Sequence, residues 1–235
     1  MNGPSATLPP VIVVCPLQFE LQGLVRAGLE QYCELHCCGP GAHGVKRWFD
    51  RHRPVGRTVV LAGLAGALRP EIAAGSAWVI REALSDASPS ECWHPNWMPA
   101  LSPDAQPPLR VVSVTCAVTL PREKTLLAER SGADLVDLES ATFARTADQL
   151  GLKWGIVRGV SDAAGDALPP NIDQWVDDRG GTRPVVAGLA VLRRPWLIAH
   201  VLRLKRAGDQ AMAAIAAHLK NHFAGSDRTA ASQND

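Results

Sequence analysis

The sequence predicts one α/β domain over residues 11–224, in a three-layer α/β/α arrangement with a mixed, largely parallel central sheet. Short continuous apolar runs recur along the chain, as in the buried strands of parallel sheets. Segments with apolar residues at helical spacing separate these runs. The 235 residues suffice for one sizeable core, and neither a repeat nor a linker divides them. Residues 1–10 and 225–235 have the composition of flexible termini.

The first predicted strand is the apolar run Val11–Cys15 (VIVVC). Pro16 can open a helix directly after it, because a proline is tolerated in the first helical turn. Leucines at helical spacing follow that proline. Thr58–Leu61 (TVVL) predicts a second strand, which we expect to end in a glycine-bearing loop, AGLAGAL.

Two further runs, Ala77–Ile80 and Val111–Thr115, also predict strands. Residues 82–108 between them are rich in Pro, Ser and Trp, a composition that indicates an irregular excursion.

The last two predicted strands are Asp134–Leu138 and Trp154–Val160, with an amphipathic helix between them. Asp137 can cap the start of this helix, and Gly151 stands where a glycine commonly ends one. Strand, helix and strand of this length predict a right-handed βαβ unit.

Composition excludes some classes of protein. The formal net charge is +1, which gives no reason to expect a nucleic-acid binder. The start of the chain lacks the pattern of a signal peptide, and no apolar run is long enough for a membrane span. Six cysteines without a pairing pattern suit a reducing compartment, so we expect a cytoplasmic protein.

Cysteines and histidines gather between residues 33 and 43, namely Cys33, His36, Cys37, Cys38 and His43. A zinc site normally needs a second half at a defined spacing, which the sequence lacks. We therefore expect scattered thiols rather than a metal site.

Three acids lie close after predicted strands. Glu20 follows the first strand by one helical turn, Glu139 directly follows another, and Asp162 follows the last after one serine. Ligands of open α/β sheets bind at the carboxyl ends of the strands, so this placement predicts a site with three carboxylates. Each acid also has a structural explanation, as a stabiliser of a first helical turn or as a turn residue.

These residues carry a family resemblance. VDLESATFARTADQLGLKWGIVRGVSDAAGD (136–166) resembles the signature of the purine nucleoside phosphorylase and nucleosidase superfamily, V-D-M-E-[SAG]-A, a helix, then V-R-x-[IV]-S-D. Residues 62–80 and 13–24 resemble two further segments of that superfamily. Residues 166–215 resemble one branch, the hopanoid-associated phosphorylases, which are thought to remove adenine from adenosylhopane during hopanoid biosynthesis.

The resemblance implies roles for individual residues. Asp162 matches the acid that protonates the purine at N7, and Glu20 aligns with the carboxylate that activates water in the nucleosidases. Glu139 matches the acid that binds the ribose hydroxyls. Further implied substrate contacts are Leu138, Ser161, Ala65, Gly66 and Val118.

The nucleophile stays open between water and phosphate. Leu64 replaces a serine of many relatives, and the phosphate loop of the phosphorylases is missing from the N-terminus. Glu20 favours water, whereas the branch resemblance favours phosphate. Cations that would serve a phosphate or water site are His43, Lys46, Arg47 and Arg158, although a solvated loop or a structural ion pair explains them equally.

The predicted function is cleavage of the N-ribosidic bond of a 5′-modified purine nucleoside, with adenosylhopane phosphorolysis as the first choice. A hydrolytic nucleosidase acting on methylthioadenosine or S-adenosylhomocysteine, or a non-catalytic nucleoside- or lipid-binding relative, is the alternative. An NAD-dependent oxidoreductase is disfavoured because no GxGxxG follows the first strand. The resemblance implies no cofactor beyond phosphate as a possible co-substrate, and a homo-oligomer as the assembly.

The tail, Val191–His222, carries six basic residues and an apolar stripe at helical spacing. A C-terminal helix packed on the sheet explains this pattern. The alternative is an interfacial helix that rests on an anionic membrane at the inner face.

Overall fold

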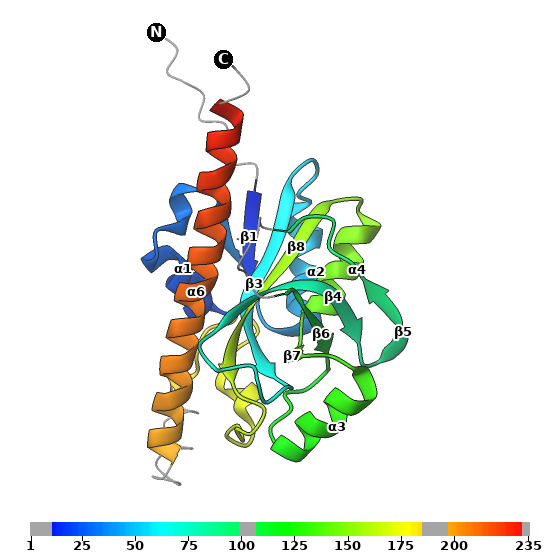
Figure 1. Ribbon diagram of the computed structural model, residues 1–235, viewed down its shortest axis with the longest axis vertical. Helices are drawn as coiled ribbons and strands as arrows, with labels where there is room; N and C mark the ends of the chain where they lie inside the picture. Colours follow the sequence, from blue (N-terminus) through cyan, green and yellow to red (C-terminus); the bar gives the residue numbers. More distant parts are fainter. Residues whose placement is uncertain (1–10, 99–106, 185–196, 232–235) are drawn as a thin grey trace.

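The computed structural model describes residues 11–98, 107–184 and 197–231 as an eight-stranded mixed sheet with helices on both faces (Figure 1). Its strands are β1 (Val11–Cys15), β2 (Glu34–Cys37), β3 (Thr58–Ala67), β4 (Ala77–Ser85), β5 (Ser88–Trp93), β6 (Leu109–Ser113), β7 (Leu135–Asp137) and β8 (Lys153–Asp162). Its helices are α1 (Gln18–Arg26), α2 (Gly41–His52), α3 (Pro121–Ser131), α4 (Ser140–Gln149) and α6 (Leu197–Ala231), with short 3-10 turns η1 (Leu29–Gln31) and η2 (Ile172–Trp175).

The sheet closes on itself. Its strand order is β2-β1-β3-β7-β6-β4-β5, and β8 pairs with both β3 and β4. Five of the strand pairs are parallel and three, β3–β7, β4–β5 and β4–β8, are antiparallel. The predicted fold class, a mixed and largely parallel sheet with helices, is confirmed, but the sheet is not open.

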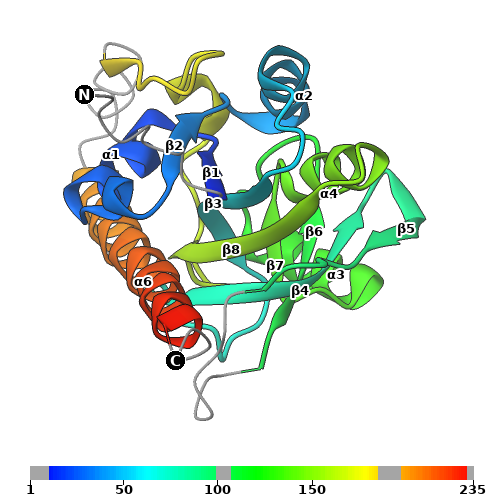
Figure 2. The same cartoon turned by 90° about the horizontal axis from the view of Figure 1, so that it is seen from above.

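Helices cover the two faces of the sheet in pairs. Seen from above, α1 and α6 lie on one side of the strands, and α2 and α4 lie on the other (Figure 2). Leu24, Met212 and Ile215 form a core with one face, while Trp48, Phe49 and Phe143 form a larger core with the opposite face. A third cluster packs α3 against β6 and β7. This arrangement holds the strand ends that bear the acids between fixed layers.

Two predictions about the middle of the chain are wrong. AGLAGAL is not a loop, because β3 continues through it to Ala67 and pairs with β8 along its whole length. Residues 82–93 are not irregular, since β4 runs on to Ser85 and β5 returns from Ser88 to Trp93. These segments are not predicted as strands because glycine, alanine and proline have weak β propensity. They form strands because they pair with neighbouring strands of the sheet.

The predicted βαβ unit is only partly correct. The helix exists as α4, and Gly151 follows it with a positive φ of 63°, as a C-terminal glycine should. The N-cap is Glu139, although the Asp137 carboxylate accepts hydrogen bonds from the first amides of the helix. The flanking strands are not a parallel pair, because β7 runs antiparallel to β3 and β8 runs parallel to it.

The C-terminal helix is longer than the sequence predicts. α6 runs to Ala231, into the segment expected to be a flexible terminus, whereas residues 1–10 and 232–235 lie outside the described part of the chain. None of the described helices is both long enough and apolar enough to cross a membrane.

Candidate active site

A cavity of about 650 Å³ opens where β3, β7 and β8 end, and α1, α6 and the segment 168–182 enclose it. Its lining is mostly apolar, with carboxylates at its inner end. Nine residues that the sequence singles out lie in its wall: Glu20, Leu64, Ala65, Gly66, Val118, Leu138, Glu139, Ser161 and Asp162. Residues that are up to 142 positions apart in the chain are thus brought to one place.

Asp162 lies at a bulge between β3 and β8. The strand register shifts after Ala65, so Gly66 pairs with Asp162 and Ser161 becomes the extra residue. A side chain on Gly66 would approach the Asp162 carboxylate to 2.9 Å, which explains the glycine. The Ser161 hydroxyl donates to Asp162 Oδ1 at 2.5 Å and fixes the orientation of this carboxylate.

Glu139 is held at the start of two helices. It is the N-cap residue of α4, and its Oε1 accepts a hydrogen bond of 2.7 Å from the Gly41 amide in the first turn of α2. The partial positive charge of a helix N-terminus stabilises a carboxylate in this position. Leu138, the residue before it, reaches the cavity wall as an apolar surface.

Glu20 on α1 also lines the cavity and is almost fully buried, with 1% of its surface exposed. Its Oε2 accepts a hydrogen bond from the Leu17 amide at 2.8 Å, and its Oε1 accepts one from the Leu64 amide at 2.7 Å. The first bond caps α1, so Glu20 has a structural role. The second bond directs the carboxylate to the strand that carries Leu64, at the cavity.

Arg158 on β8 does not line the cavity but forms ion pairs with two of the acids. Its Nη2 lies 2.5 Å from Asp137 Oδ2 and 3.4 Å from Glu139 Oε2, and the guanidinium is fully buried. Its Nη1 has no partner among the described residues. A Cβ on Gly63 would lie 2.9 Å from this Nη1 and 3.0 Å from Glu20 Oε1, which explains the glycine at this position.

Burial raises the pKa of two of these acids. Desolvation raises the pKa of Glu20 to about 8, although the Leu64 amide and Arg158 oppose the shift. Desolvation, together with the nearby Asp137 charge, raises the pKa of Glu139 to about 7, again against Arg158. Both groups therefore exchange protons near neutral pH, which is typical of residues that perform acid–base chemistry.

The raised pKa of Glu20 predicts a loss of stability with rising pH. The folded state keeps the Glu20 proton up to about pH 8, whereas the unfolded chain releases it near pH 4.5. The stability that the Glu20 proton contributes is therefore complete below pH 4.5 and is lost as pH rises to about 8. This contribution is on the order of a few kcal/mol. We expect the free energy of unfolding, measured with urea, to fall between pH 5 and 8 and to level off above pH 8.

The Glu20→Gln variant should show a flatter dependence over the same range. Glu30→Gln, at an exposed glutamate near the end of α1, is the control and should keep the wild-type slope. Parallel curves for all three proteins would contradict the assignment of this slope to Glu20.

None of the four cations named from the sequence lines the cavity. His43 and Lys46 are exposed on α2. Arg47 donates to the Asp178 carbonyl oxygen at 2.5 Å, so it anchors the segment that covers the cavity. Arg158 does not line the cavity either, but its free Nη1 is directed to Gly63 beside Glu20.

Sequence reasoning missed several residues of the site. Lys124 on α3 is fully buried and forms an ion pair with Asp162 Oδ2. Its place in the polar segment PREKTLLAERS gave no sign of burial. The apolar outer wall, formed by Leu168, Ile172, Trp175, Val201 and Leu204, was also missed, because only the folded chain brings these residues to the strand ends.

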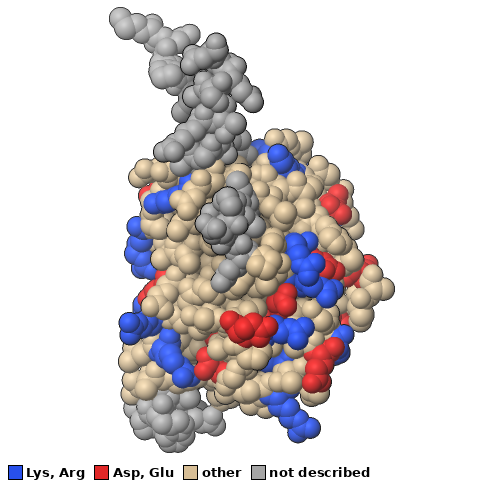
Figure 3. Space-filling model, viewed as in Figure 1, with Lys and Arg blue, Asp and Glu red and all other residues tan. Residues whose placement is uncertain are grey.

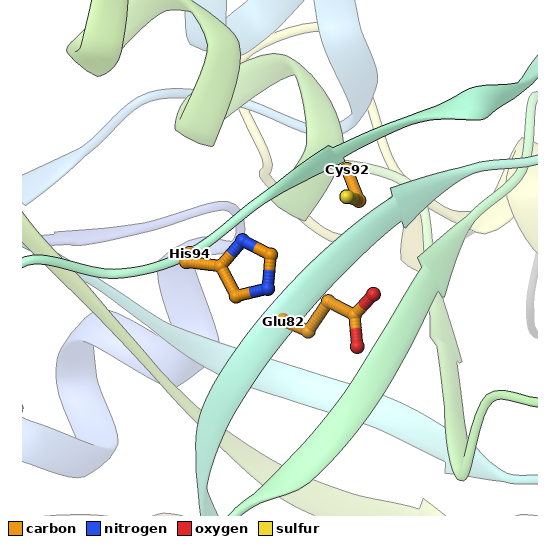
Figure 4. A group of neighbouring side chains, drawn as sticks. All are labelled: Glu82, Cys92 and His94. Atoms are coloured by element: carbon orange, nitrogen blue, oxygen red, sulfur yellow. The ribbon is translucent and has the colours of Figure 1, made fainter.

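The structure groups one set of potential metal ligands elsewhere. Glu82 on β4 faces Cys92 on β5 and His94 just after it, with the ligand atoms within 4.8 Å of one another (Figure 4). The Glu82 carboxylate already accepts hydrogen bonds from Arg110, at 2.7 and 3.2 Å, and none of the three residues lines the cavity. The six cysteines are free thiols, including those between residues 33 and 43.

Comparisons with known proteins agree with this architecture. Residues 109–193 match the family model described as "Phosphorylase superfamily", a segment that includes Lys124, Glu139 and Asp162. A sequence search of curated proteins found no significant match.

Several solved structures of similar fold bear the names of nucleosidases or of a nucleoside hydrolase. Futalosine hydrolase of Helicobacter pylori superposes with a TM-score of 0.62 at 12% identity, covering 92% of this chain and 97% of that one. The 5′-methylthioadenosine nucleosidase of Arabidopsis thaliana gives 0.59 at 13% identity, covering 91% and 95%. A 5′-methylthioadenosine/S-adenosylhomocysteine nucleosidase of Helicobacter pylori gives 0.57 at 12%, covering 91% and 99%. At these identities the likeness establishes the fold.

Proposed function

We propose that this protein is an enzyme that hydrolyses the N-ribosidic bond of a 5′-modified purine nucleoside and releases the base. The observation that carries the proposal is the set of three buried carboxylates, Glu20, Glu139 and Asp162, around one cavity with an apolar outer part. The nucleosidases of the same fold and the matched family model support this class of reaction.

The chemistry assigns a task to each carboxylate. Breaking the bond between sugar and base leaves positive charge on the sugar and negative charge on the base. Asp162, at the strand end, delivers a proton to N7 of the departing purine. Glu139 accepts hydrogen bonds from the ribose hydroxyls and favours the positively charged sugar. Leu138 excludes water beneath the ring. No cofactor is needed for these steps.

Water suits the nucleophile position better than phosphate. Glu20 lines the cavity beside the Leu64 amide and offers an acceptor for the proton of a water molecule. Arg158 is surrounded by Asp137, Glu139 and Glu20, so its charge is already balanced and a phosphate dianion would be repelled. The cations that line the cavity, Arg26 and Lys205, lie at its exposed rim beside Asp209.

The outer part of the cavity favours an apolar 5′ substituent. Phe19, Leu64, Trp175, Val201 and Leu204 enclose the space beyond the three acids. Burial of apolar substituent surface there would contribute about 25 cal/mol per Å². Adenosine with a 5′-alkylthio group fits this description. Adenosylhopane, the substrate that the sequence resemblance implies, is a larger 5′-substituted adenosine, and it stays a hypothesis.

The proposed function is tested by product analysis. We expect the purified protein to release adenine and a free 5′-substituted ribose from 5′-methylthioadenosine or a longer 5′-alkyl adenosine, in phosphate-free buffer. Added phosphate should not change the rate. The products are identified by mass spectrometry, and adenosylhopane is assayed in parallel.

Two outcomes would redirect the proposal. A ribose 1-phosphate product that appears only with phosphate would assign phosphorolysis instead. Binding of the nucleoside without release of base would favour the non-catalytic relative.

Contact with a membrane is a second, separate proposal. On α6, Ile198 and Leu202 expose apolar side chains, and Arg203 and Arg206 are exposed nearby. Basic side chains recur along the left edge of the molecule in Figure 3, where Figure 1 places α1 and α6. Each basic residue near an anionic surface adds about 1 kcal/mol of attraction. Of the predicted interfacial stripe, Val201 and Leu204 line the cavity instead, and Arg193, Arg194 and Trp196 lie outside the described residues.

We expect the protein to sediment with anionic vesicles at low salt and not with neutral vesicles. Arg203→Glu with Arg206→Glu should abolish sedimentation. Arg51→Glu with Arg122→Glu, which makes the same charge change on α2 and α3, should not. Equal loss in both double variants would mean that net charge alone is responsible.

A homo-oligomeric assembly stays a prediction from the sequence.

A further inference from the structure

Lys124 is the least expected residue near the cavity. It lies in the first part of α3, where the partial positive charge of the helix N-terminus disfavours a cation. The side chain is nevertheless fully buried. Burial of an ammonium group is costly unless an anion and hydrogen-bond acceptors surround it, so the site must supply them.

The surroundings of Lys124 supply those partners. Its Nζ forms an ion pair with Asp162 Oδ2, and it donates to the carbonyl oxygens of Ala163 at 2.8 Å and Asp166 at 3.1 Å. The three donors of the ammonium are therefore all used. Asp162, whose Oδ1 accepts from Ser161, lines the cavity. The carboxylate thus stands between a buried proton donor and the substrate space.

A purely structural role would also explain the two carbonyl contacts. Ala163 and Asp166 belong to the turn that follows β8, and Lys124 ties this turn to α3. That role does not require the carboxylate of Asp162. Among the three buried carboxylates Glu20, Glu139 and Asp162, Asp162 is the one that faces an ammonium, whereas Glu20 and Glu139 face Arg158. The choice of lysine matters because lysine can give up a proton and arginine cannot.

We propose that Lys124 is a positioning residue that supplies, through Asp162, the proton accepted by the departing base; this inference rests on the proposed function. The bond between C1′ and N9 breaks, and its electron pair goes to the base. Lys124 gives a proton to the Asp162 carboxylate, which passes it to N7. Water adds its oxygen to C1′ and gives its proton to Glu20. One enzyme proton has then moved from Lys124 to Glu20, and it returns through solvent after product release.

The test compares two leaving groups with the same 5′ substituent. Adenine needs a proton to leave, whereas 4-nitrophenolate leaves as a stable anion. Lys124→Met should lower adenine release by about 10²-fold or more, as expected for loss of general-acid catalysis. Release of 4-nitrophenolate from the matching riboside should stay close to the wild-type rate, which also shows that the site is folded. Arg122→Met, at an exposed position on the same helix, is the control.

Lys124→Arg separates proton supply from charge. The guanidinium keeps a positive charge beside Asp162 but does not release a proton, so we expect adenine release to remain low and nitrophenolate release to persist. Adenine release restored by Lys124→Arg, or unaffected by Lys124→Met, would overturn the proposal. Equal loss of both activities in both variants would also overturn it and assign Lys124 to holding the turn. A wild-type protein that cleaves neither substrate would instead refute the proposed function itself.

Discussion

Replacement of Asp162 by asparagine is expected to lower the rate of adenine release by about 10²–10⁴-fold, the range for loss of a general acid. Asparagine has the same shape, and its amide oxygen can still accept a hydrogen bond from Lys124. It cannot carry a proton to the base. The buried ammonium would lose its counterion, so the melting temperature should fall while the protein stays folded.

The measurement is steady-state adenine release with saturating substrate, together with a thermal unfolding curve. Asp50→Asn, at an exposed position on α2, is the matched control and should behave as wild type. Release of 4-nitrophenolate should survive in Asp162→Asn for the reason given for Lys124. Near wild-type adenine release in that variant would remove Asp162 from the mechanism.

Replacement of Glu20 by glutamine is the second large effect that we expect, a decrease in kcat/KM of about 10²–10⁴-fold. Glu20 can accept a proton from water only when it is ionised. Burial raises its pKa to about 8, so most of the free enzyme is protonated at this position at pH 7. The wild-type kcat/KM should therefore rise with pH and level off above pH 8.

The pH profile and the variant test this assignment together. Glu20→Gln should lack the rise through pH 8, and the control Glu30→Gln should keep it. A flat wild-type profile between pH 6.5 and 9 would show that Glu20 is not the base. The same ionisation lowers the stability of the fold, so activity and stability should change in opposite directions over this range.

The elements that could be predicted from the sequence are those with strong local patterns. β1, α1 and α4 follow from an apolar run or from helical spacing, and each has a clear start or end signal. The second half of β3 could not be predicted, because its glycines and alanines have weak β propensity. They form a strand since β8 pairs with them along its length, a contact between residues about 95 positions apart.

The candidate site divides in the same way. Glu20, Glu139 and Asp162 could be named because each follows a predictable strand and matches a family motif. Lys124 could not, since a lysine in a polar helical segment is normally exposed. Nor could Arg158 be assigned to the rear of the site, because its three acidic neighbours come from two distant segments.

The cavity is built from two sets of residues that are separate in the chain. Its inner end consists of strand termini, where a shift in one residue disturbs several carboxylates. Its outer end consists of one face of α6 and the segment 168–182, which Arg47 anchors through the Asp178 carbonyl oxygen. Under the proposed function, substitutions at Trp175, Val201 or Leu204 are expected to change which 5′ substituent is accepted, while the three buried carboxylates keep their places.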